Sequence, residues 1–195
     1  MSLLSKQAAA LLLTAIASLI VVPAQAAPAK PAGDAPAQKV SMLGGKFTFT
    51  LPKGFTATPL PAGEVAQGTA GATGTMYSNA TSRTVVIAAE NTIVNGTNVK
   101  DDDGAFLDTT MADFAAQRIK ALPDAKILSE KSLKQKGTGL GLRQLDTSAT
   151  QGGGPTLDTT LLGASGTRMA VVQVISRASD KAGHEALVKQ IASGK

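Results

Sequence analysis

The sequence predicts an α+β fold in which an antiparallel β-sheet of about six to seven strands is flanked by two α-helices. Three observations lead to this fold. A clearly alternating strand opens the ordered part of the chain, an amphipathic helix follows near its middle, and four more strands come close together before a final helix. Because short connections join the late strands, we expect them to be antiparallel neighbours.

The first strand is predicted at residues 46–51, KFTFTL. Phe47, Phe49 and Leu51 share one face and polar residues occupy the other, which is typical of a strand that packs on one side only. A proline ends this strand. Residues 56–75 are rich in Gly, Ala, Thr and Pro, and are predicted to form a long, mobile loop that is either functional or poorly ordered.

A hairpin is predicted next, with strands at 75–78 and 84–89 joined by the turn-rich segment 79–83. A helix follows, and Asp102 or Asp103 can cap its N-terminus. A proline stops the helix at its other end. One apolar stripe with helical spacing runs along it, formed by Leu107, Met111, Phe114, Ala115, Ile119 and Leu122.

Four strands are predicted to follow the helix, at residues 126–136, 140–149, 156–163 and 167–176, separated by glycine-rich turns. The last of them is apolar on both faces and is therefore expected in the centre of the sheet, covered on both sides. The final helix begins near Ser179 or Asp180. It directs Leu187, Val188 and Ile191 toward the core.

The N-terminus has the pattern of a cleaved export signal. A short segment with one lysine precedes an apolar run of 15 residues, which is shorter than the roughly 20 residues that span a bilayer as a helix. We expect cleavage of residues 1–26 between Ala26 and Ala27, so that no transmembrane helix remains in the mature form. Residues 27–38 are predicted to be a flexible Ala/Pro-rich linker, and residues 39–195 a single globular domain.

Composition narrows the classes of function. The chain contains no cysteine, which excludes disulfides, thiolate metal sites and a lipid-anchoring cysteine, and suits an exported periplasmic protein. Without the leader, 18 basic residues face 14 acidic ones, a mild excess. One tyrosine and no tryptophan leave few flat side chains for stacking on bases, so no nucleic-acid partner is predicted.

Several segments together resemble the DcrB family. They are the opening strand with its LPKGF ending, residues 77–81 (YSNAT), residues 143–146 (RQLD), and residues 160–163 with 169–174 (TLLG and MAVVQV). The resemblance runs from about Val40 to Ile191. It implies a PsbP-like α/β sandwich in a bacterial envelope protein, without known catalytic residues. Family members are typically lipoproteins, and this chain lacks the cysteine, which favours a free periplasmic form.

Three motifs suggest chemistry, and each has a simpler structural interpretation. Asp101, Asp102 and Asp103 match only part of an EF-hand loop, and helix capping explains them better. The glycines of residues 137–141 open a strand instead of a helix, so they form a hairpin turn and no phosphate site. His184 is the only histidine and is interpreted as a structural or solvent-exposed residue of the last helix. No cofactor, metal site or catalytic residue is predicted.

One surface feature is a candidate for binding. Lys131, Lys134, Lys136 and Arg143 lie on two consecutive strands, and pairing of these strands gathers their charges into a possible basic patch. Its partner would be an unknown envelope protein or an anionic lipid surface. The sequence thus predicts a non-enzymatic periplasmic interaction or accessory module. The alternative is a small-ligand-binding domain with an apolar pocket between sheet and helix, under residues 56–75.

Overall fold

The computed structural model describes residues 35–63, 71–93 and 96–195. The predicted leader and its cleavage site between Ala26 and Ala27 lie outside this part of the chain. The described strands are β1 (Gln38–Met42), β2 (Phe47–Leu51), β3 (Thr56–Pro59), β4 (Thr73–Asn79), β5 (Thr84–Thr92), β6 (Lys126–Lys134), β7 (Gly141–Gln151), β8 (Gly154–Ser165) and β9 (Arg168–Arg177), and the helices are α2 (Gly104–Ala121) and α3 (Lys181–Ser193).

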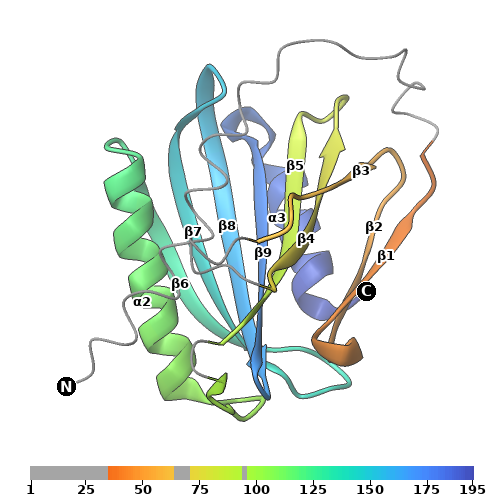
Figure 1. The fold of residues 1–195 in the computed structure, drawn as a ribbon. Helices are drawn as coiled ribbons and strands as arrows, with labels where there is room; N and C mark the ends of the chain where they lie inside the picture. Colours follow the sequence, from red (N-terminus) through yellow and green to blue (C-terminus); the bar gives the residue numbers. More distant parts are fainter. Residues whose placement is uncertain (1–34, 64–70, 94–95) are drawn as a thin grey trace.

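Seven strands form one antiparallel sheet in the order β3-β4-β5-β9-β8-β7-β6 (Figure 1). The predicted fold class is therefore confirmed. The late strands form a meander as expected, and β9 lies in the middle of the sheet between β5 and β8. Its apolar residues on both faces are explained by this place, since both faces are covered by packed elements.

The strands β1 and β2 pair with each other and form a separate two-stranded hairpin. Strand β2 was predicted, and β1 was not. Val40 and Met42 alternate as buried residues in β1, so a short signal for the strand is present in the sequence. Gln38, which the sequence analysis assigns to the linker, is the first residue of β1.

The two helices begin where aspartates cap them. The Asp103 carboxylate accepts a hydrogen bond from the Phe106 backbone N–H at 3.1 Å, which confirms the predicted cap of α2. The Asp180 carboxylate does the same for the Gly183 N–H of α3. Helix α3 ends at Gly194, whose φ of 73° lies in the left-handed region that glycine adopts without steric cost.

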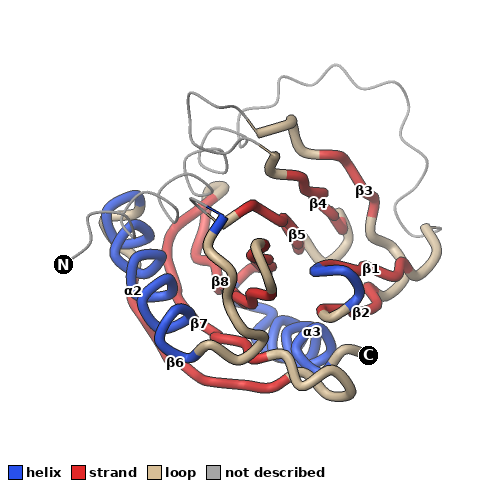
Figure 2. Tube along the Cα trace, turned by 60° about the horizontal axis from the view of Figure 1, so that its bottom comes forward, coloured by secondary structure: helices blue, strands red, loops and turns tan. Residues whose placement is uncertain are grey.

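The helices cover opposite faces of the sheet. In Figure 2 the sheet curves, with α3 and the β1–β2 hairpin on its inner side and α2 on its outer side. Neighbouring residues of one strand therefore enter different cores: Leu161 packs in the inner core, and Leu162 in the outer core. The inner core contains Phe47, Phe49 and Leu51 of β2, together with Leu187, Val188 and Ile191 of α3 as predicted.

Two predictions about local structure are wrong. Residues 56–75 are not one loop, because Thr56–Pro59 form the edge strand β3 and residues from Thr73 onward belong to β4. All four β3 residues are exposed, so backbone pairing with β4 holds this strand and no apolar alternation marks it. Ile119 is 47% exposed and does not belong to the buried stripe of α2.

A buried ion pair connects the same turn of α2 to the sheet. Arg118 of α2 is 5% exposed and pairs with Asp158 of β8, which is 1% exposed and also accepts a hydrogen bond from Gln173 at 2.7 Å. Burial raises the pKa of Asp158 to about 6, and the Arg118 charge opposes this shift. The pair links α2 to the sheet.

Candidate functional site

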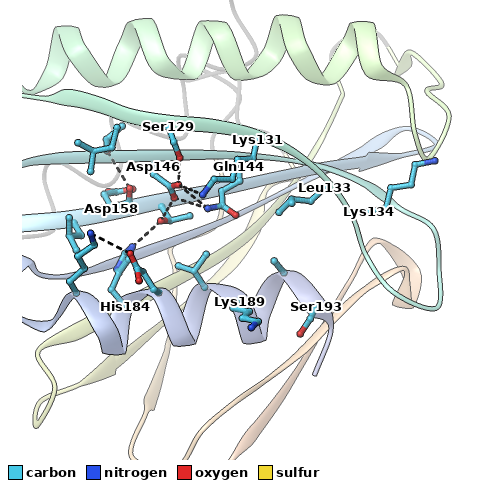
Figure 3. Close-up of a pocket in the computed structure, with 18 of the residues that line it drawn as sticks. Ser129, Lys131, Leu133, Lys134, Gln144, Asp146, Asp158, His184, Lys189 and Ser193 are labelled. Atoms are coloured by element: carbon cyan, nitrogen blue, oxygen red, sulfur yellow. Dashed lines mark hydrogen bonds and ion pairs between the residues drawn. The ribbon is translucent and has the colours of Figure 1, made fainter.

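A groove of about 650 Å³ runs between α3 and the β6–β7 end of the sheet. It exists because α3 packs against β2, β8 and β9 and leaves the same face of β6 and β7 uncovered. Consistent with this exposure, the residues that β6 and β7 direct to this face are largely polar: Ser129, Lys131, Gln144 and Asp146. We call this concavity the α3 groove (Figure 3).

Five lysines line the α3 groove. Three of them are the predicted residues Lys131, Lys134 and Lys136, and two more, Lys181 and Lys189, come from α3. Sequence reasoning missed the two α3 lysines, because only the packing of α3 beside β6 brings them to the other three. The predicted patch is thus part of a larger basic group, and its role in binding stays a prediction.

Arg143 does not lie with these lysines. It follows Leu142, which faces the inner core, and successive residues of a strand point to opposite faces. Its guanidinium pairs with Asp108 of α2 and donates to the Gly104 carbonyl at 3.4 Å. The structure therefore places Arg143 on the α2 side of the sheet, where it supports helix packing.

Acidic residues pair with the lysines at one end of the groove but not with all of those farther along it. At the end near the start of α3, Lys131 pairs with Asp146 at 3.2 Å and Lys181 pairs with Glu185 at 3.7 Å. Lys136 and Lys189 have no ion-pair partner in the part of the chain that the structure describes. One end of the groove therefore carries uncompensated positive charge.

Asp146 is the centre of a hydrogen-bond cluster at the balanced end. Its carboxylate accepts from Ser129 at 2.5 Å, from Thr159 at 2.7 Å and from the Gln144 amide at 2.8 Å. Burial acts to raise the pKa of Asp146, but these hydrogen bonds and that of Lys131 outweigh it and lower the pKa. Asp146 is therefore a stable anion and a weak base.

His184 connects α3 to this cluster. Its Nε2 lies 2.9 Å from the Thr159 hydroxyl and its Nδ1 lies 2.7 Å from the Ser176 hydroxyl, so both ring nitrogens are engaged. The side chain is 5% exposed, which confirms the structural interpretation of this residue. Burial lowers the pKa of His184 and keeps the imidazole neutral near neutral pH.

This cluster positions α3, and its serine hydroxyls are poorly placed to act as nucleophiles. Ser129 donates to a carboxylate of lowered pKa, and Ser176 is 1% exposed. Among residues 35–63, 71–93 and 96–195, no three carboxylate or histidine side chains gather closely enough to hold a metal ion. No helix in these ranges is long and apolar enough to cross a membrane.

Protonation of His184 should destabilise the fold. Because its folded-state pKa lies below the ordinary value of 6.5, the unfolded chain binds the proton more tightly, and the contribution of His184 to stability is lost as pH falls. We expect the difference in unfolding free energy between wild type and His184→Gln to shrink from about pH 7 to about pH 5. Urea unfolding across this range measures it. A difference that stays constant with pH would contradict the assignment.

No protein-family model and no curated protein matches the sequence. Among solved structures, the cyanobacterial PsbP (CyanoP) from Synechocystis sp. PCC 6803 aligns with a TM-score of 0.49 at 11% identity, over 84% of this chain and 96% of that chain. A protein of unknown function from Pseudomonas aeruginosa aligns with a TM-score of 0.39 at 12% identity, over 79% of this chain and 92% of that one. At these identities function has to be inferred from the side chains of this chain.

Proposed function

We propose that the protein is a non-enzymatic binding module of the bacterial cell envelope, that it works in the periplasm, and that the α3 groove is its binding surface. Three sequence features support the location: the leader-like residues 1–26, the absence of cysteine, and the resemblance to the DcrB family. The groove supports the binding role.

The observation that carries the proposal is the uncompensated charge at one end of the groove. Lys136 and Lys189 come from different elements and converge on a concave surface, where low-dielectric walls strengthen the field of their ammonium groups. A negatively charged partner would neutralise this positive charge. Exposed lysines on a convex surface would be screened by water and salt, and would carry no such preference.

The α3 groove also fits the alternative function, a small-ligand-binding domain. It lies elsewhere than the pocket that the sequence predicted. That pocket was expected under residues 56–75, near β3 and β4 at one edge of the sheet. The α3 groove lies at the opposite edge, beside β6, and its volume is within the range of small-molecule sites. A binding module with a small-ligand groove therefore unites the two candidate functions.

The proposal is tested in intact cells. The mature protein should be released with the periplasmic fraction and should begin at Ala27. A photo-crosslinking residue at position 189, in the groove, should capture a binding partner, and the same residue at position 120, in the last turn of α2, should not. Lys120 is a matched control because it is also an exposed lysine near the C-terminal end of a helix. Unprocessed protein in the cytosol, or identical products from both positions, would overturn the proposal.

A further inference from the structure

We propose that the α3 groove binds an anionic amphiphile lengthwise, with its head group at Lys136 and Lys189 and its alkyl chain along the aliphatic residues between α3 and β6. This inference rests on the proposed function in one respect only, that the groove is the binding surface. It adds the chemical class of the ligand and the direction in which the ligand lies.

The direction follows from which elements meet at each end of the groove. Gln135, next to Lys136, lies beside Gly194 at the end of α3, so the end of β6 meets the end of α3. Lys189 is on the last turns of the same helix. In Figure 3, Leu133, Lys134 and Ser193 lie toward this end, Ser129, Asp146 and His184 lie toward the other, and Lys189 lies between them on α3. We call these the cationic end and the polar end.

The cationic end suits an anionic head group. Lys134 reaches out of the groove to Asp102 at 3.5 Å, which leaves Lys136 and Lys189 to face a ligand. The C-terminal end of α3 contributes roughly half a negative charge, and the two ammonium groups exceed it. Lysine binds phosphate as a point charge without strict geometry, which fits two flexible side chains on separate elements.

The polar end, in contrast, disfavours a second anion. The Asp146 carboxylate lies there with its hydrogen bonds already satisfied, and Glu185 adds another negative charge close to Lys181. Because these carboxylates already pair with Lys131 and Lys181, this end offers a second anionic group no unpaired cation. A ligand with a single charged head and an uncharged remainder therefore fits the groove better.

The uncharged remainder meets aliphatic side chains that alternate with the polar residues of this face. Leu133 of β6 and Ala192 of α3 are partly exposed and pack against the inner core, and Val188 lies one turn earlier on α3. Leu128 lines the groove farther along β6, beyond Lys131 and Ser129, and is 55% exposed. From Leu133 to Leu128 the strand extends about 16 Å. The groove is therefore long enough for the alkyl chain of a lipid-derived molecule.

Two other ligand classes fit these observations less well. Inorganic phosphate would use the lysines and leave the aliphatic side chains uncovered. An acidic peptide could pair with the free edge of β6, but that edge carries Lys126, Lys131 and Lys134 and a register irregularity between Ile127 and Ser129. Lysines and bulges are features that protect an edge strand against pairing.

The experiment titrates the purified mature protein with dodecyl phosphate below its micelle concentration. Two probes separate the contributions: inorganic phosphate has the head without the chain, and dodecyl maltoside has the chain without the charge. We expect dodecyl phosphate to bind at least tenfold more tightly than either. Decyl phosphate should bind several-fold more weakly than dodecyl phosphate, because each methylene fully removed from water contributes about fourfold in affinity.

Variants locate the site. Reversing both charges in Lys136→Glu/Lys189→Glu should weaken binding of dodecyl phosphate at least tenfold, and Lys120→Glu on the opposite side of the sheet should leave it unchanged. Leu128→Ser should weaken dodecyl phosphate and leave any inorganic phosphate binding unaffected. All four side chains are exposed, so the variants should fold, and their thermal unfolding verifies this.

Each remaining outcome overturns the inference. Equal affinity for inorganic phosphate would show that the aliphatic side chains take no part, and equal affinity for dodecyl maltoside would show that the charge takes none. Binding that is unaffected by the double charge reversal would place the ligand elsewhere. If no amphiphile binds while position 189 still captures a partner in cells, the inference fails and the proposed function stands.

Discussion

Replacing Arg118 by alanine is expected to lower the free energy of unfolding by about 3–5 kcal/mol at neutral pH. The substitution leaves the Asp158 carboxylate buried in a 1% exposed position without a cation. Desolvating an unpaired charge costs far more than the pair contributes, because most of the loss is the penalty on the partner left behind. Urea unfolding of the single variant measures the effect.

The effect should depend on pH in a definite direction. Burial already holds the pKa of Asp158 at about 6, above its ordinary value of 3.8, so stability from this group falls as pH rises between these two values. Without Arg118 the pKa rises further, and acid relieves the penalty by neutralising the carboxyl. The loss caused by Arg118→Ala should therefore be smaller at about pH 5 than at about pH 8.

A double variant provides the control for Arg118→Ala. Arg118→Met combined with Asp158→Leu removes both charges and fills the space with apolar groups, and should recover most of the lost stability. If the single variant is as stable as wild type, or if the double variant is the less stable of the two, the pair does not have the role described.

The second large effect is expected for Phe47→Ala, which should cost about 3–5 kcal/mol. Phe47 is fully buried in the inner core, and its ring centroid lies 5.7 Å from that of Phe49. The β1–β2 hairpin pairs with no strand of the main sheet, so its side chains hold it against α3 and the sheet. The cavity left by the phenyl ring should therefore loosen the hairpin as a unit.

Hydrogen exchange and urea unfolding together check Phe47→Ala. Amide protection should be lost first in β1 and β2, and the midpoint of unfolding should fall. Ile119→Ala is the matched control, because Ile119 is 47% exposed and its truncation should change stability by less than about 0.5 kcal/mol. Equal losses from the two variants would contradict the packing described for the hairpin.

Much of the fold could be predicted from periodicity. Three features follow from local sequence patterns alone: the alternation in β2, the apolar residues of β9 and the glycine-rich turns of the meander. The strand β3 could not be found this way, because all of its residues are exposed and only backbone pairing holds it. Ile119 has the correct spacing for a buried stripe, but at this turn of α2 Arg118 is the residue that packs on the sheet, and Ile119 stays 47% exposed.

The site was harder to predict because it depends on tertiary packing. Lys181 and Lys189 join the lysines of β6 only because α3 lies beside that strand, and nothing in the spacing of α3 indicates its neighbours. A weak signal existed for the buried ion pair. Asp158 stands among residues that alternate toward two cores, and a charged residue there requires a partner. Only the fold shows that the partner of Asp158 is Arg118.

The pairing of β5 with β9 has a consequence for when the polypeptide folds. Val85 pairs with Ile175, so the middle of the sheet cannot be assembled until almost the entire chain has left the ribosome. Until then β5, in the N-terminal half of the chain, lacks the central strand with which it pairs. Folding of the sheet is therefore expected to be completed only after synthesis, when β9 becomes available to pair with β5.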